Sequence, residues 1–110
     1  MKKGFIEEKA KALHVSENAV IRLVDLAFKE TDEQLPLLQQ AIEKVDYDET
    51  QSISHRIKGY LLNLKFDELG NLAQEMNLLS QTHGDMKVIK AKFEQFITGF
   101  EALRKDVANG

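Results

Sequence analysis

The chain has 110 residues, a formal net charge of -3 at pH 7 and no cysteine. This length fits one domain over residues 1–110 with a single core, and the absence of thiols excludes disulfides and thiolate metal sites. The acidic balance gives no general attraction to nucleic acid or anionic lipid. One proline and six glycines, beside 43% hydrophobic residues, favour long helices over a turn-rich sheet protein. Since no apolar run is long enough to span a membrane and no signal-type segment follows the first residues, we expect a soluble cytoplasmic protein.

The first part of the chain predicts two helices. Over residues 5–13, apolar side chains recur with helical spacing, which indicates a short amphipathic helix. Ser16 then has the position of an N-cap, with Glu17 in the first turn. A second apolar stripe continues to about Val45. Although Pro36 interrupts it, we expect one long, bent helix here.

The third predicted helix carries His55. Asp46 and Glu49 have the spacing of a capping box, with Asp in place of the usual Ser or Thr, and predict a helix over residues 47–65. At about 100° per residue, His55 lies opposite an apolar stripe and therefore faces water. That stripe consists of Ile53, Ile57, Tyr60, Leu61 and Leu64. The same projection puts on the wet side Gln51, Ser52, Lys58, Gly59 and Leu62. A glycine inside a helix costs about 1 kcal/mol relative to alanine, so Gly59 indicates that something must come close to the histidine.

Two further helices complete an all-α chain. An apolar stripe over residues 66–79 predicts the fourth helix, and residues 82–85 supply a glycine stop followed by an aspartate start. The last helix is expected over residues 86–107, with core aromatics at Phe93, Phe96 and Phe100. Five helices joined by short loops predict an antiparallel helix bundle.

A particular spacing surrounds His55. Lys58 follows it by three residues and Gly59 by four, with apolar residues, Asn63 and Leu64 beyond. This pattern, together with the helices before and after it, resembles the histidine-containing phosphotransfer (HPt) domain over most of the chain. The resemblance implies an antiparallel four-helix bundle, here with an additional short N-terminal helix. It also implies a function, in which the histidine relays a phosphoryl group between aspartates of receiver domains.

The resemblance implies a role for the residues around His55. Its imidazole would take the phosphoryl group from an aspartyl phosphate and form phosphohistidine. Lys58 would neutralise charge on the phosphoryl oxygens, and Gly59 would leave the gap through which the receiver's aspartate approaches. On the next helix, the family's Gln or Glu that holds the histidine ring corresponds to Asn77, with Gln74 as the alternative one turn back. A docking rim for the receiver is expected from Gln51, Ser52, Arg56, Leu62 and Lys65.

The partners implied are response-regulator receiver domains. Mg²⁺ for the transfer would come from the receiver, so no metal site or cofactor is expected in this chain. The sequence contains no phosphate-binding glycine loop and no ATP site, and we do not expect the chain to phosphorylate itself. We expect a monomer that binds neither nucleic acid nor membrane. Whether it is a free-standing relay protein or a module of a larger hybrid sensor kinase stays open.

Three other functions compete with this interpretation. An HPt-like bundle without phosphotransfer would serve as an adaptor or dimerisation module, which the bulky residues 60–62 and the short Asn77 side chain keep open. Residues 13–22 have the pattern of a helix-turn-helix DNA reader, but their second helix begins with acidic and neutral side chains instead of basic ones. Metal binding or hydrolysis is disfavoured because the three histidines share no ligand spacing.

Overall fold

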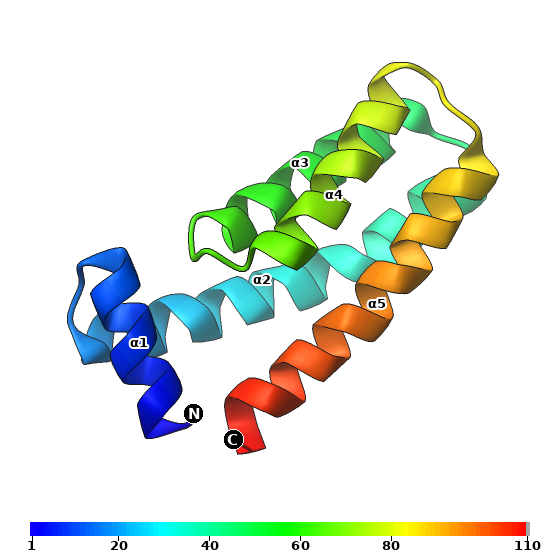
Figure 1. Ribbon diagram of the computed structural model, residues 1–110. Coiled ribbons are helices and arrows are strands. Elements are labelled where there is room, and N and C mark those ends of the chain that lie inside the picture. Colours follow the sequence, from blue (N-terminus) through cyan, green and yellow to red (C-terminus); the bar gives the residue numbers. More distant parts are fainter. Residues whose placement is uncertain (110) are drawn as a thin grey trace.

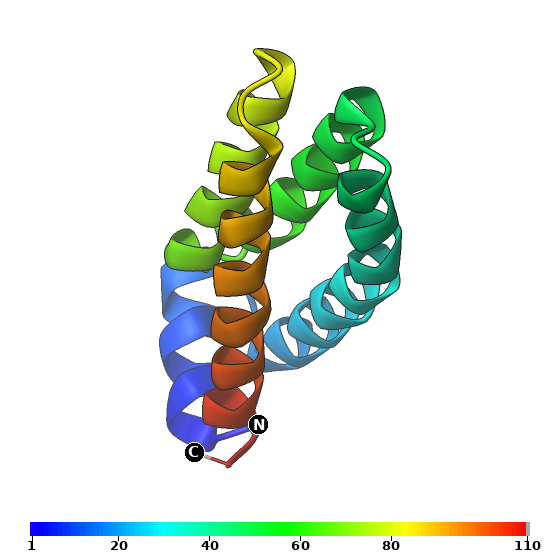
Figure 2. The same ribbon diagram turned by 90° about the vertical axis from the view of Figure 1, so that its right-hand side faces the viewer.

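The computed structural model describes residues 1–109, and these residues form five helices. The helices are α1 (Lys3–Leu13), α2 (Glu17–Glu43), α3 (Tyr47–Leu62), α4 (Asp67–Gln81) and α5 (Met86–Asn109). Helices α2 and α5 run the length of the molecule, α3 and α4 cover one half of it, and α1 lies beside the other half (Figure 1). Figure 2 shows the same arrangement after a 90° turn. The predicted all-α bundle of four antiparallel helices with a short additional N-terminal helix is confirmed. No helix within residues 1–109 is long and apolar enough to cross a membrane.

Side-chain caps fix the starts of α2 and α3. The Ser16 hydroxyl accepts a hydrogen bond from the Ala19 amide at 3.1 Å, and the Asp46 carboxylate accepts one from the Glu49 amide at 3.0 Å. Both predicted N-caps are therefore confirmed. The capping box is one-sided, because the Asp46 amide donates to the Ala41 carbonyl at 2.9 Å.

The end of α3 differs from the prediction. The helix stops at Leu62, three residues before the predicted end at Lys65, and the backbone of Lys65 is left-handed with φ 59°. This reversal lets the Phe66 amide donate to the Leu61 carbonyl at 2.9 Å and buries the Phe66 ring. Burial of that ring competes with helix continuation and ends α3 early.

The turn between α4 and α5 also differs in detail. His83, and not the glycine after it, takes the left-handed conformation, with φ 51°. Its ring stacks on Tyr47 with 4.5 Å between the centroids, and the Tyr47 hydroxyl donates to the Gly84 carbonyl at 2.7 Å. The turn is therefore anchored to the start of α3.

The core lies between the apolar faces of the four bundle helices. On α3, the predicted stripe is buried except for Tyr60, which is half-buried at its edge. The aromatic residues predicted for the core of α5 are buried, and Phe100 meets Phe28 of α2 edge to face at 5.4 Å. Because these contacts bury one side of α3 completely, its opposite side is left at the surface.

Helix α1 is attached through contacts with the loop after α3. The Phe5 ring stacks on Phe66 at 6.2 Å, and the Lys9 ammonium lies 4.4 Å from the centre of the same ring. Lys9 donates to the Lys65 carbonyl at 3.1 Å, while the Lys65 ammonium donates to the Ala12 carbonyl at 2.8 Å. Partial burial lowers the pKa of Lys9 below its usual 10.5. This pair of lysine bonds holds α1 against the bundle.

Candidate functional site

His55 lies in the middle of α3 with its side chain exposed. The periodicity of the helix explains the exposure. Ile53 and Ile57 flank it in sequence and are fully buried, so position 55 falls on the opposite side of a helix with about 3.6 residues per turn. The predicted orientation of the histidine is confirmed.

His55 lines a shallow hollow of about 500 Å³ between α3 and α4. The other lining residues are Asp48, Gln51, Ser52, Arg56, Asn77 and Gln81. Three residues of the predicted rim and one of the two predicted supporting residues are thus brought together with the histidine. Asp48 and Gln81 were not predicted. Helical spacing could have found them, because Gln81 follows Asn77 by one turn and Asp48 precedes His55 by two.

Asn77 brings an unsatisfied acceptor to this hollow. It is only 4% exposed, and its Oδ1 atom has no hydrogen-bond partner among the described residues. A buried polar group without a partner costs about 1–3 kcal/mol, so this oxygen is an open position for an N–H donor. Its Nδ2 atom donates to Gln74 Oε1 at 3.4 Å. The two residues predicted as alternatives are therefore bonded to each other.

Gly59 lies one turn beyond His55, and no packing contact in the structure requires a glycine there. A Cβ atom at this position would meet nothing within 4 Å. At Gly70 of α4, by contrast, a Cβ would overlap the side chain of Leu62, 2.6 Å from its Cγ. Close helix packing therefore explains Gly70 and does not explain Gly59.

Lys58 and Arg56 border the histidine on its two sides. Lys58 is half-buried, and no hydrogen bond or ion pair engages its ammonium within residues 1–109. Arg56 reaches across to α2, where its guanidinium donates to Gln34 Oε1 at 3.4 Å. One cation beside the histidine is thus left without a partner in the described chain, and the other is held at the edge of the hollow.

Two predicted docking residues lie away from the hollow. Leu62 is half-buried over Gly70, where it packs α3 against α4. Lys65 lies in the loop after α3 and is bonded to the Ala12 carbonyl. Both residues therefore have structural contacts. The helical projection of α3 could not reveal those of Lys65, because Lys65 lies outside that helix.

The described residues form no cluster of metal ligands. Within residues 1–109, no group of three His, Asp or Glu side chains comes together as a ligand set. The hollow beside His55 contains one carboxylate, that of Asp48. The side chains around the histidine form a polar surface with the imidazole at its centre.

Comparison with protein families identifies a match. The family model described as Hpt domain matches residues 22–106, well over half of the 110-residue chain. The matched segment begins in the second turn of α2 and extends into the last turns of α5, so it includes His55 and leaves α1 outside. Neither the comparison with curated proteins nor the comparison with solved structures gave a match.

Proposed function

Since the chain belongs to the Hpt-domain family, we propose that it is a phosphorelay module whose His55 accepts a phosphoryl group from a receiver-domain aspartate and passes it to another receiver. Family membership implies histidine phosphotransfer with response-regulator receivers as partners. The observation that carries the assignment is the exposure of His55 on the wet face of α3. Of the other two histidines, His14 lies outside the matched segment and His83 lies in a turn, stacked on Tyr47.

The transfer replaces a P–O bond by an N–P bond. The lone pair of neutral Nε2 attacks the aspartyl phosphate, the P–O bond to the receiver's aspartate breaks, and an N–P bond forms. The aspartate leaves as a carboxylate, and Nδ1 keeps its proton. We assign Asn77 Oδ1 as the acceptor for that N–H. The missing partner of this buried oxygen supports the assignment, because the bond would satisfy it and turn Nε2 outward.

Lys58 and Gly59 serve the approach and the charge of the phosphoryl group. The Lys58 ammonium, one turn from the histidine, neutralises developing charge on the phosphoryl oxygens. The open space at Gly59 lets the rim of the receiver's active site come close to α3. Mg²⁺ is supplied by the receiver, and this chain carries the phosphoryl group without generating it from ATP.

The receiver docks over the hollow and its rim. Gln51, Ser52 and Arg56 offer hydrogen-bond donors and acceptors around the imidazole, and Asp48 and Gln81 extend this surface toward the ends of α3 and α4. On the α2 side, Leu37 is 47% exposed one turn after Gln34, the partner of Arg56. This leucine gives the rim an apolar contact of the kind that anchors interfaces.

A transfer assay tests the proposal. Receivers phosphorylated with radiolabelled phosphate are incubated with the wild type and with His55→Gln, while His14→Gln and His83→Gln serve as matched controls. We expect label on the wild type and on both controls, and none on His55→Gln. Binding of a receiver to the wild type without any transfer from a panel of receivers would instead identify an adaptor, and the proposal would be wrong.

A further inference from the structure

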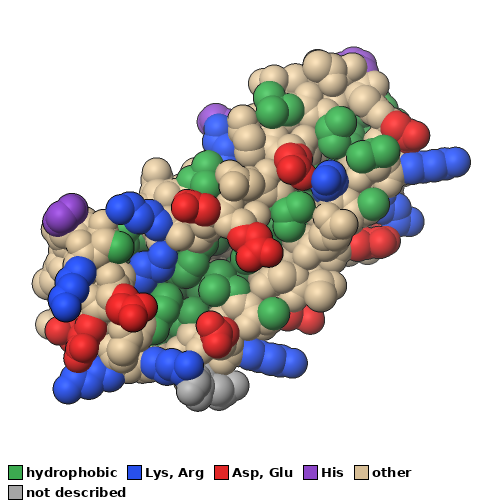
Figure 3. Space-filling view, viewed as in Figure 1, with side chains coloured by type: hydrophobic (Ala, Val, Ile, Leu, Met, Phe, Trp, Pro, Cys, Tyr) green, Lys and Arg blue, Asp and Glu red, His purple; other side chains and the backbone are tan. Residues whose placement is uncertain are grey.

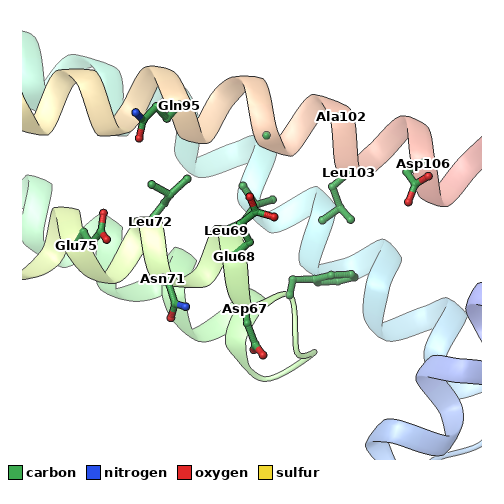
Figure 4. A pocket seen from close by; sticks show the side chains of 12 residues that line it. Asp67, Glu68, Leu69, Asn71, Leu72, Glu75, Gln95, Ala102, Leu103 and Asp106 are labelled. Atoms are coloured by element: carbon green, nitrogen blue, oxygen red, sulfur yellow. The ribbon is translucent and has the colours of Figure 1, made fainter.

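A second surface lies between α4 and α5, away from the histidine. It is a groove of about 960 Å³ (Figure 4), with an apolar floor built mainly from Phe66, Leu69, Leu72, Ala102 and Leu103. The space-filling view shows apolar side chains gathered in a hollow, with acidic and basic side chains around it (Figure 3). Phe66 and Leu69 are buried at its base, so the apolar surface that a partner can reach belongs to Leu72, Ala102 and Leu103.

Four carboxylates line the groove, and no lysine or arginine does. Glu75 is paired with Lys92 at 2.9 Å, and Asp67 lies at the margin beside Lys9. Glu68 and Asp106 form no ion pair with any side chain that the structure describes. Two carboxylates beside an apolar floor therefore stay without a counter-charge, one on each wall of the groove.

The groove and the histidine hollow use different sides of α4. Glu75 lines the groove and Asn77 lines the hollow, and two residues correspond to about 160° around a helix. A partner in the groove therefore leaves the surface around His55 free.

We propose that this groove docks a basic amphipathic helix of a partner protein. Its apolar face would lie on Leu72, Ala102 and Leu103, and its Lys or Arg side chains would face Glu68 and Asp106. A helix is the natural occupant because both walls are helices, and a third helix packs into the groove between them. The charges complement each other, which favours this partner over neutral or acidic segments.

Helix α2 of a second copy of this chain fits the groove poorly. The apolar residues that α2 leaves most exposed are Leu23, Leu26 and Leu37. On the surface of α2 they alternate with the carboxylates of Asp25, Glu30 and Glu33, which would meet the acidic rim of the groove. Like charges at such a contact disfavour self-association.

The inference is tested with a peptide probe. A fluorescent 18-residue peptide of leucine and lysine with helical spacing is titrated with the full chain, and fluorescence anisotropy reports the Kd. We expect saturable binding that weakens as salt is raised. The double variant Glu68→Gln with Asp106→Asn should raise the Kd about fivefold. The matched control, Glu94→Gln with Glu101→Gln, changes two exposed charges of α5 outside the groove and should change the Kd by less than about twofold.

A steric variant separates the groove from general charge attraction. Ala102 is exposed in the groove wall, so Ala102→Tyr fills the groove without disturbing the core, which a thermal melt checks. This variant should lose most peptide binding, and His55→Gln should bind like the wild type. Equal weakening by the rim pair and the control pair would show non-specific attraction and overturn the proposal. A dimer that is detected by sedimentation and dissociated by Ala102→Tyr would also overturn the proposal, because the occupant would then be a second copy. Because peptide binding does not involve His55, a failure to bind the peptide is distinct from a failure of phosphotransfer.

Discussion

Replacing Gly59 by alanine should make the protein more stable and its phosphotransfer slower. The stability gain follows from two observations. Gly59 lies inside α3, where glycine is less favourable than alanine by about 0.5–1 kcal/mol. A methyl group at this position would meet no atom within 4 Å, so no packing cost opposes the gain. Because Gly59 is in the last turn of the helix, we expect a gain of about 0.5 kcal/mol, or a Tm increase of about 2–4 °C.

The same methyl group points into the space that a receiver would enter. Urea unfolding and thermal melts measure the stability, and transfer of label from a phosphorylated receiver measures the rate. A larger substitution, Gly59→Gln, extends the series, because it keeps helix propensity while adding bulk. We expect the transfer rate to fall in the order glycine, alanine, glutamine, while both variants stay as stable as the wild type or more so.

Gly70→Ala is the matched control. Here the added methyl overlaps Leu62, so the variant should lose about 1–3 kcal/mol of stability. Two glycine-to-alanine changes on neighbouring helices are thus expected to shift stability in opposite directions. Destabilisation by Gly59→Ala, or undiminished transfer in Gly59→Gln, would refute the argument that this glycine is kept for receiver access.

Three further predictions follow from individual contacts. Asn77→Leu removes a buried acceptor that lacks a partner, so stability in urea should stay within about 0.5 kcal/mol of the wild type or rise, while phosphotransfer slows. A loss of several kcal/mol would contradict the unsatisfied state of its Oδ1 atom. Ser16→Ala removes the α2 cap and should cost about 1 kcal/mol in the same measurement, and an unchanged midpoint would argue against the cap. Since burial lowers the pKa of Lys9 below 10.5, the folded chain binds fewer protons than the unfolded chain between the lowered pKa and 10.5. The free energy of unfolding should therefore increase as pH rises through that window. Lys9→Met should abolish this increase, which urea titrations at neutral and alkaline pH measure.

The helices and the face carrying the histidine could be predicted because they depend on local chemistry. The caps at Ser16 and Asp46 are bonds to amides three residues away, and the exposure of His55 follows from the periodicity of its own helix. Gln51 and Ser52 share that helix, so the projection places them beside the histidine as well.

Contacts between distant segments could not be predicted from the sequence. The end of α3 depends on burial of Phe66, and the position of Lys65 depends on its bond to Ala12 in α1, 53 residues away. The hydrogen bond between Asn77 and Gln74 cannot be predicted from the sequence either, so the sequence leaves the two residues as alternatives. The groove between α4 and α5 forms only when the two helices pack, and its acidic residues are scattered over residues 67–106.

The most direct test of the central claim is an NMR measurement on the phosphorylated protein. Chain labelled with ¹⁵N at its histidines is phosphorylated by a receiver, and ³¹P–¹⁵N coupling identifies the nitrogen bonded to phosphorus. We predict a single phosphoramidate at Nε2 of His55, with Nδ1 protonated. Coupling to His14 or His83, a bond at Nδ1 of His55, or no phosphoramidate at all would contradict this account of the site.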